Sequence, residues 1–237
     1  MRQATFGISC GQVTRFAAVL LASVAWPAWS ATHGGLVPQY SEDLRPTLTA
    51  SKTGIAKLEF DAFGRGFRLK LWSNERLARV AATGSVQLYR GNIQGVPGSW
   101  ARIAVLEGLP RGMIWDGREL YVVDAAPEGV NDGAAGTVMF KLSDAVLERS
   151  VSFAGDTVES PRDAGEAYDG LVDELRGRSQ VMKAGATQFI EVSILADATL
   201  LARYANETQA RNALLTRLNN VDGIFSSQLG VELQVAS

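Results

Sequence analysis

Turn signals recur at short intervals between Ser51 and Leu142, and this spacing constrains the fold more than any other feature of the sequence. The signals fall at Gly54, Gly64 to Gly66, Asn74, Gly84, Gly91 to Gly98, Gly108 to Gly112 and Asp116-Gly117. The segments between them are shorter than an ordinary helix and have the length of strands. We therefore expect a β-rich region, either a sandwich or a partly open barrel.

Two pairs of segments in this region predict hairpins. Apolar residues alternate with polar ones at Leu58, Phe60 and Ala62, and again at Phe67, Leu69 and Leu71. Because side chains of a strand point to alternate faces, this pattern predicts one hairpin with a single apolar face. Asp116-Gly117, between two apolar runs, predicts a second hairpin. Residues 137–142 are expected to form a last strand.

The first thirty residues have the layout of a secretory signal peptide. Arg2 and Arg15 occur without any acidic residue, residues 16–28 are an apolar stretch, and Ala28-Trp29-Ser30 supplies small residues for cleavage. We expect cleavage between Ser30 and Ala31 and a secreted or periplasmic product. The apolar stretch has 13 residues, whereas a membrane span needs about 20. No comparable stretch follows, so we expect no membrane segment after signal cleavage.

The charge and the rare residue types exclude several functions. Removal of residues 1–30 leaves 21 basic and 25 acidic residues and a net charge of −4, so no basic surface for nucleic acid is expected. The only cysteine is Cys10, inside the signal, which excludes a disulfide in the mature chain. The only histidine is His33, and one histidine cannot supply the ligands of a catalytic zinc.

Residues 154–186 are rich in Gly, Asp, Glu, Arg and Ser and show little apolar periodicity. We therefore expect a linker here, following a β-rich segment of residues 31–153. Arg176 and Arg178 make a basic segment within it that is either a processing site or part of an ordinary solvated linker.

Residues 187–237 have a different pattern, which predicts a strand, a helix and a second strand. An apolar run begins at Phe189, and an amphipathic helix is predicted from Thr208 onward. Its apolar stripe is expected at Ala210, Leu214, Leu218, Val221, Phe225 and Leu229. Asn206 or Thr208 can cap its start and Gly230 its end. With residues 231–235 as the second strand, this is a βαβ unit with parallel strands. The fold class is therefore α+β, with an incomplete α/β unit after a β-rich segment.

Two stretches of the chain resemble one known family. Residues 188–197, 202–204, 213–225 and 229–231 resemble the first strand, first helix and second strand of reprolysin-like (ADAM-type) metzincin peptidases. The most specific part is Asn-Asn-Val-Asp-Gly-Ile-Phe at residues 219–225. The pro-segment of the same family resembles a second set of residues: 67–71 with Asn74 and Leu77, 88–91, Ile93, Gly95, Ser99, Ala101, 108–109, 112–114 and Tyr121.

This resemblance implies the N-terminal part of a secreted zinc endopeptidase precursor that acts on protein or peptide substrates. The family binds zinc through a His-Glu-x-x-His-x-x-Gly-x-x-His helix, with the glutamate as general base. That motif is absent from residues 1–237, so we expect no catalysis by this chain alone. The pro-segment is expected to bind its own catalytic domain.

Latency and calcium binding are further expectations from the resemblance. A cysteine thiolate on zinc is excluded because no cysteine follows Cys10. Steric blockage, or an aspartate such as Asp163 or Asp169 on the metal, stays open against ordinary surface acids. Glu191 stands where the family often places a calcium ligand; the alternative is a paired or solvated glutamate on a strand.

Aromatic residues in the β-rich region have two interpretations. Trp72, Trp100, Trp115, Tyr89 and Tyr121 either line a ligand groove or, as is usual for aromatic residues in strands, belong to the core. Arg102 and Glu107 near them form no recognisable acid–base pair. The alternative to a peptidase precursor is a secreted binding or inhibitory module, without enzymatic activity, that derives from such a pro-segment.

Overall fold

The computed structural model describes residues 36–50, 54–81, 86–126, 136–147, 164–179, 188–194, 196 and 198–236. The predictions for the signal peptide, for Ser30 and Ala31, and for His33 and Asp163 lie outside these residues.

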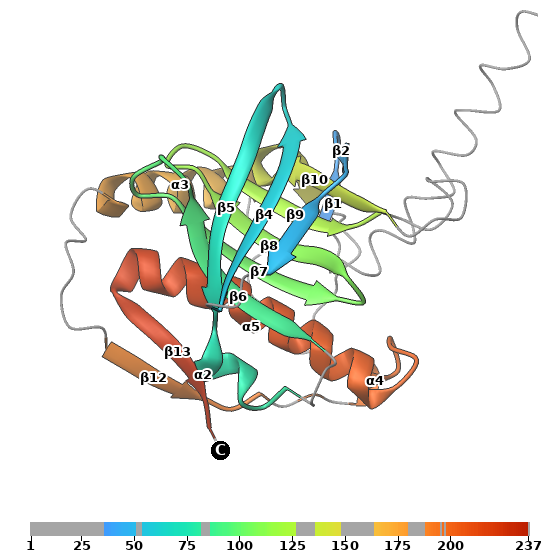
Figure 1. The fold of residues 1–237 in the computed structure, drawn as a ribbon. Coiled ribbons are helices and arrows are strands. Elements are labelled where there is room, and N and C mark those ends of the chain that lie inside the picture. Colours follow the sequence, from blue (N-terminus) through green and yellow to red (C-terminus); the bar gives the residue numbers. More distant parts are fainter. Residues whose placement is uncertain are drawn as a thin grey trace, which may run out of the picture.

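Most of the described chain forms one curled antiparallel sheet of nine strands (Figure 1). In sheet order the strands are β2 (Glu42–Leu44), β10 (Thr137–Lys141), β9 (Leu120–Ala125), β8 (Leu109–Trp115), β7 (Trp100–Leu106), β6 (Gln87–Ile93), β5 (Arg65–Ser73), β4 (Ile55–Ala62) and β3 (Thr47–Ala50). A separate pair joins β1 (Leu36–Pro38) to β11 (Ala145–Leu147). The β-rich prediction is confirmed, in the form of a half-barrel.

The two edge strands of this sheet, β2 and β3, follow each other directly in the chain. The short connection between them brings the two edges together. β2 pairs with β10 and β3 pairs with β4, although only Arg45 and Pro46 separate β2 from β3. The backbone N–H of Phe63, at the end of β4, donates a hydrogen bond of 2.6 Å to the carboxylate of Glu42 in β2. At this seam, a side chain rather than strand pairing links the two edges of the half-barrel.

Two glycines inside strands allow the sheet to curl tightly. A Cβ atom at Gly91 in β6 would lie 2.0 Å from the carbonyl oxygen of Lys70. At Gly112 in β8, where φ is 153°, it would lie 1.9 Å from the carbonyl oxygen of Arg102. Only glycine permits such close backbone approach, so these positions favour bending of the strands.

The inner side of the sheet is an apolar core. It is formed by Leu44, Ala56, Leu58, Phe60, Ala62, Phe67, Leu69, Leu71, Ile93, Ala101, Ile103, Val105, Ile114, Tyr121, Val123 and Met139. All six alternating residues of the first predicted hairpin belong to this set, so that hairpin is confirmed. The second hairpin also forms, with a turn of four residues between β8 and β9 in which Asp116 accepts backbone N–H bonds from Arg118 and Glu119.

The C-terminal strands and helix follow the predicted order. β12 (Gln188–Val192) and β13 (Val231–Val235) pair in parallel. Between them lie α4 (Ala198–Leu201) and α5 (Glu207–Leu229). The side chain of Asn206 accepts the N–H of Gln209 at 2.9 Å, and Gly230 ends α5 with φ of 66°. The predicted caps are thus confirmed.

Residues 154–186, predicted as a linker without periodic structure, contain helix α3 (Ala164–Ser179). That part of the prediction is wrong, because the three apolar residues Leu171, Val172 and Leu175 are enough to fix one side of a helix against the sheet. Two shorter helical segments are α2 (Glu75–Ala78) and the 3₁₀ turn η1 (Leu142–Asp144). In the described residues, no helix combines the length and the apolar character needed to cross a membrane.

Helix α5 lies across the outer side of the curled sheet, against β7, β8 and β6 (Figure 1). Its predicted apolar stripe is only partly correct. The buried residues of α5 are Ala210, Asn212, Leu215, Asn219, Asp222 and Gly223, whereas Val221 and Leu229 are 37% and 53% exposed. The helix is rotated relative to the predicted stripe because polar residues on it find buried partners in the sheet.

Candidate functional site

The outer face of β7 lies under α5 and presents Trp100, Arg102 and Ala104, all buried. The inner face of the same strand presents Ala101, Ile103 and Val105 to the apolar core. Both faces of β7 are therefore covered, which is unusual for a charged residue such as Arg102. Its charge needs a partner supplied by α5.

Asp222 of α5 is that partner. The Nε atom of Arg102 lies 2.8 Å from Oδ2 of Asp222, and their side chains are 7% and 0% exposed. Nη2 of Arg102 also donates to Oγ of Ser226 at 2.9 Å, and Nη1 to the carbonyl of Ala101 at 3.2 Å. Burial lowers the pKa of Arg102 and Asp222 opposes that shift; the guanidinium still remains protonated at neutral pH.

The Asp222 carboxylate connects three parts of the chain. Its Oδ2 accepts from Arg102 of β7 and, at 3.4 Å, from Nδ2 of Asn74, which precedes α2. Its Oδ1 accepts the backbone N–H of Leu233 in β13 at 2.8 Å. One buried carboxylate therefore fixes α5 both to the sheet and to the strand that follows α5.

Two asparagines extend this network. Nδ2 of Asn74 donates to Oδ1 of Asn219 at 2.9 Å, and Nδ2 of Asn219 donates to the carbonyl of Tyr89 in β6 at 3.2 Å. Asn74 is 1% exposed and Asn219 is 0% exposed. We call Asn74, Arg102, Asn219, Asp222 and Ser226 the polar interface.

Gly223 allows α5 to approach the sheet closely. A Cβ atom here would lie 2.6 Å from the ring of Trp100 and 2.8 Å from Cγ of Arg102. Trp100 and Trp115 pair across β7 and β8 and are buried with Leu120. For Trp100, Trp115 and Tyr121, the core interpretation of the aromatic residues is confirmed, whereas Trp72 is 37% exposed.

A second group of charges lies at the rim of the same interface. Glu232 of β13 accepts from Nη1 of Arg90 in β6 at 2.7 Å and forms an ion pair with Arg76 of α2. Arg76 also lies over the ring of Phe189 in β12, 5.3 Å from its centroid. The rim therefore adds contacts between the sheet and the C-terminal strands.

The chemistry of the polar interface is recognition rather than catalysis. A buried ion pair adds little net stability over apolar packing, but removal of one partner leaves an unpaired buried charge. Arg102 and Asp222 are enclosed between the sheet and α5, where a substrate has no access to them. The polar interface consequently selects one arrangement of α5 on the sheet.

The sequence does not predict this pairing, and it shows no acid–base pair between Arg102 and Glu107. Arg102 is the single charged residue in the strand Trp100–Leu106, and Asn219 and Asp222 are one helical turn apart. A charge in an otherwise apolar strand and polar residues on one helix face were the available signals. Neither reveals its partner, which is 120 residues away.

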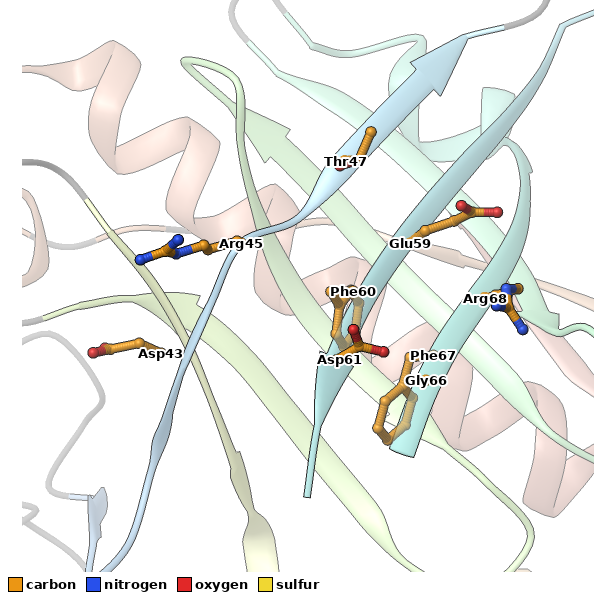
Figure 2. Close-up of a pocket in the computed structure, with 9 residues that line it drawn as sticks. All are labelled: Asp43, Arg45, Thr47, Glu59, Phe60, Asp61, Gly66, Phe67 and Arg68. Carbon is orange, nitrogen blue, oxygen red and sulfur yellow. The ribbon is translucent and has the colours of Figure 1, made fainter. Parts of the chain in front are cut away.

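A separate pocket lies at the seam of the sheet (Figure 2). It has a volume of about 450 Å³ and is lined by Asp43, Arg45, Thr47, Glu59, Phe60, Asp61, Gly66, Phe67 and Arg68. Figure 2 shows Arg45 and Arg68 on its two sides with Glu59 and Asp61 between them. The rings of Phe60 and Phe67 are stacked at 5.2 Å.

Glu191, the predicted calcium ligand, lies on β12 with its side chain exposed, and it accepts a bond of 3.4 Å from Nε2 of Gln234. Among the described residues, no three His, Cys, Asp or Glu side chains gather in a group suited to a metal ion.

Arg176 and Arg178, the predicted processing residues, belong to α3. Nη2 of Arg176 donates to the carbonyl of Arg118 at 2.9 Å, and the neighbouring Leu175 is fully buried. Asp169 is also in α3 and exposed. The processing residues are thus in a packed helix.

The zinc implied by the resemblance does not fit the residues that the structure describes. Those residues include neither histidine nor cysteine, because His33 and Cys10 fall outside them. Carboxylates without imidazole or thiolate hold zinc poorly.

In comparisons with known proteins, no family model and no curated protein matches the chain. The resemblance to reprolysin-like peptidases rests on the residues quoted above.

Proposed function

We propose that this chain is the N-terminal part of a secreted zinc metalloendopeptidase precursor. In this proposal, the curled sheet is the pro-segment, and β12, α5 and β13 begin the catalytic domain. The polar interface is the place where the pro-segment holds the first helix of that domain. The zinc ligands and the general base belong to the parent beyond these residues.

The proposal is supported by a direct contact between the two stretches that resemble the family. Asn74 belongs to the stretch that resembles the pro-segment, and Asn219 and Asp222 belong to the Asn-Asn-Val-Asp-Gly-Ile-Phe run. These three side chains form one buried group, with contacts of 2.9 and 3.4 Å from Asn74. The contact supports a shared role in folding for the two stretches.

The expected role of the sheet is that of a folding template. Apolar packing alone tolerates several orientations of a helix, whereas a buried charge tolerates only those that pair it. Asp222 fixes α5 to β7 and β13 together. The pro-segment would thereby set the first parallel strands of the peptidase before the rest of that domain forms.

The first test is the nucleotide sequence past codon 237. A peptidase parent should encode the His-Glu-x-x-His-x-x-Gly-x-x-His motif there. A continued frame that encodes a complete domain without this motif would contradict the proposal.

The second test is the yield of active enzyme from the parent precursor. Arg102→Ala should reduce that yield at least about tenfold, as expected when a buried charge loses its partner. Lys57→Ala, on the exposed side of β4, is the matched control and should leave the yield unchanged. Equal yields from both variants would argue against a template role.

The alternative function is a secreted binding or inhibitory module without enzymatic activity, and the seam pocket favours it. Among the residues that the structure describes, no hydrogen bond or ion pair joins the side chains of Asp43, Arg45, Glu59, Asp61 and Arg68 to one another. Charges of both signs beside the edge of the apolar core suit a short peptide with free termini.

Calorimetric titration with Phe-Leu, N-acetyl-Phe-Leu and Phe-Leu-amide tests this alternative. The two blocked peptides should bind more weakly than Phe-Leu. Arg45→Gln should also weaken the binding of Phe-Leu. Lys57→Gln is the control outside the pocket. Absence of heat at millimolar dipeptide would reject the pocket as a peptide site.

A further inference from the structure

The outer half of the β4–β5 hairpin is paired only within itself among the residues that the structure describes. On one side, the pairing of β4 with β3 ends at Glu59. On the other side, the pairing of β5 with β6 ends at Leu69, and one further bond joins the N–H of Gln94 to the carbonyl of Arg68 at 2.8 Å. Residues 60–67, here called the hairpin tip, extend beyond both neighbouring strands (Figure 1). An isolated two-stranded hairpin is only marginally stable in water, so the tip depends on side-chain contacts.

A carboxylate of the opposite sheet edge holds the hairpin tip from one side. The backbone N–H of Phe63 donates to Glu42 of β2 at 2.6 Å, and the hydroxyl of Tyr40 donates to the other oxygen of that carboxylate at 2.9 Å. The ring of Phe63 lies 6.1 Å from the ring of Tyr40 and 5.5 Å from that of Tyr121. Hydrogen bonds to a charged acceptor are stronger than neutral ones, so Glu42 and Phe63 form a first latch.

An ion pair holds the hairpin tip from the other side. Arg65 pairs with Asp116 in the β8–β9 turn, and its Nη2 donates to the hydroxyl of Tyr121 at 3.1 Å. The side chain of Asp116 is buried, whereas that of Arg65 is partly exposed to solvent. Because Arg65 reaches solvent, its guanidinium stays hydrated when the pair separates. This second latch can therefore be released.

The backbone at the turn of the hairpin tip is strained. Phe63 has φ of 52°, in the left-handed region that favours glycine. A bulky residue with such a φ is uncommon and persists only where its surroundings fix it. Glu107 has φ of 53° in the corresponding turn between β7 and β8, but it is exposed. The first latch and the ring contacts therefore hold Phe63 in a conformation that opening of the tip would relieve.

The hairpin tip forms one wall of the seam pocket. The pocket is lined from the tip by Phe60, Asp61, Gly66 and Phe67, and from the side of β2 by Asp43 and Arg45 (Figure 2). We infer that the tip is a flap of this pocket, which the two latches keep closed on β2 and which opens about a hinge at Glu59 and Arg68. Opening widens the pocket toward the apolar core and regulates the entry of a ligand with an apolar side chain. Only the identity of that ligand, a short peptide, rests on the alternative function proposed above.

Two alanines of β4 provide a matched test, because only one of them belongs to the hairpin tip. Ala62 and Ala56 are both buried in the inner core, but only Ala56 is paired with strands on both sides. Ala62→Cys and Ala56→Cys are each made in the full chain with Cys10→Ser, so that a thiol reagent reports on a single site. The modification rate measures how often that site opens. In Ala62→Cys this rate should hardly change at low urea concentrations, as expected of local opening, whereas in Ala56→Cys it should follow global unfolding.

Release of the first latch should act on the hairpin tip alone. Glu42→Ala should accelerate modification of Ala62→Cys at least about tenfold, because a hydrogen bond to a charged group is lost, and should act far less on Ala56→Cys. Glu42→Gln retains an acceptor oxygen and should accelerate modification less. Glu107→Ala, in the corresponding turn, is the control and should have no effect.

Three results would overturn the inference. These are equal acceleration at the two sites by Glu42→Ala, equal rates for Glu42→Ala and Glu107→Ala, and a rate for Ala62→Cys that rises with urea in step with that of Ala56→Cys. The first would mean that Glu42 only stabilises the whole fold. None of the three depends on whether Phe-Leu binds, so a failure of the flap is distinguishable from a failure of the alternative function.

Discussion

Both faces of β7 are buried, but by different kinds of contact. On the inner face, Ala101, Ile103 and Val105 meet only the apolar core. On the outer face, Arg102 forms an ion pair with Asp222 of α5 between buried aromatic and small residues. The apolar inner face therefore stabilises the sheet. The polar contacts of the outer face determine where α5 packs on it.

The physical basis is the different cost of an error on each face. A misplaced apolar side chain still contacts apolar neighbours, so packing errors on the inner face cost little for each residue. A misplaced Arg102 would be a buried charge without a partner, which is far more costly. The outer face therefore rejects wrong arrangements of α5 more strongly than the inner face rejects wrong packing.

The largest expected effect comes from removing the charge partner on the outer face. Asp222→Ala should lower the free energy of unfolding by about 3–5 kcal/mol, because Arg102 is left buried and unpaired. Urea unfolding measures the change. The double variant Arg102→Met with Asp222→Leu is the control and should recover most of the stability. If Asp222→Ala lowered the free energy of unfolding by less than about 1 kcal/mol, the outer face would be no more sensitive to substitution than the inner face.

The next largest effect is expected at Gly223, where α5 approaches the outer face of the sheet closely. In Gly223→Ala the added methyl group would lie 2.6 Å from the Trp100 ring. Overpacking of this kind costs about 1–3 kcal/mol, and the better helix propensity of alanine returns about 1 kcal/mol. A net loss of up to about 2 kcal/mol is expected in thermal unfolding. A gain in stability would show that α5 does not approach the sheet so closely.

Much of the fold could be predicted from the sequence because its signals are local. The alternation from Leu58 to Leu71, the turn at Asp116-Gly117 and the caps Asn206 and Gly230 each depend on a few neighbouring residues. All four are present in the structure. The joining of β2 to β3 at opposite sheet edges has no such local signal.

The polar interface could not be predicted, because its partners are far apart in the sequence. Apolar spacing predicted a stripe on α5 that includes Val221 and Leu229, both exposed in the structure. The stripe rule assumes that apolar residues face the core. It fails where Asn219 and Asp222 pair with the sheet. Helix α3 was missed because few apolar residues define its packed side.

A smaller effect is expected on the inner face. Ile103→Val removes one methylene from the apolar core and should cost about 0.5–1.5 kcal/mol in urea unfolding. The change should leave the packing of α5 unaltered, because Ile103 faces away from it. If Ile103→Val lowered the free energy of unfolding as much as Asp222→Ala does, the two faces would be equally sensitive to substitution.

The smallest effect at neutral pH concerns Tyr121, a polar residue on the inner side. Burial, and after it the charge of Asp116, raises the pKa of Tyr121 to about 12. An unfolded tyrosine has a pKa of about 10. The folded chain therefore keeps this proton longer, and stability that is complete below pH 10 is lost as the pH rises toward 12.

Tyr121→Phe should remove this part of the pH dependence. The difference in unfolding free energy between the natural chain and the variant should be constant below about pH 10 and shrink above it. A difference that stays constant up to pH 12 would contradict the raised pKa.

The most direct measurement is a double-mutant cycle between Arg102 and Asp222, with the free energy of unfolding of the natural chain, Arg102→Ala, Asp222→Ala and the double variant. If this pair fixes α5 on the sheet, the two losses should fail to add, with a coupling energy of about 1.5 kcal/mol or more. Losses that add within about 0.5 kcal/mol would contradict the account.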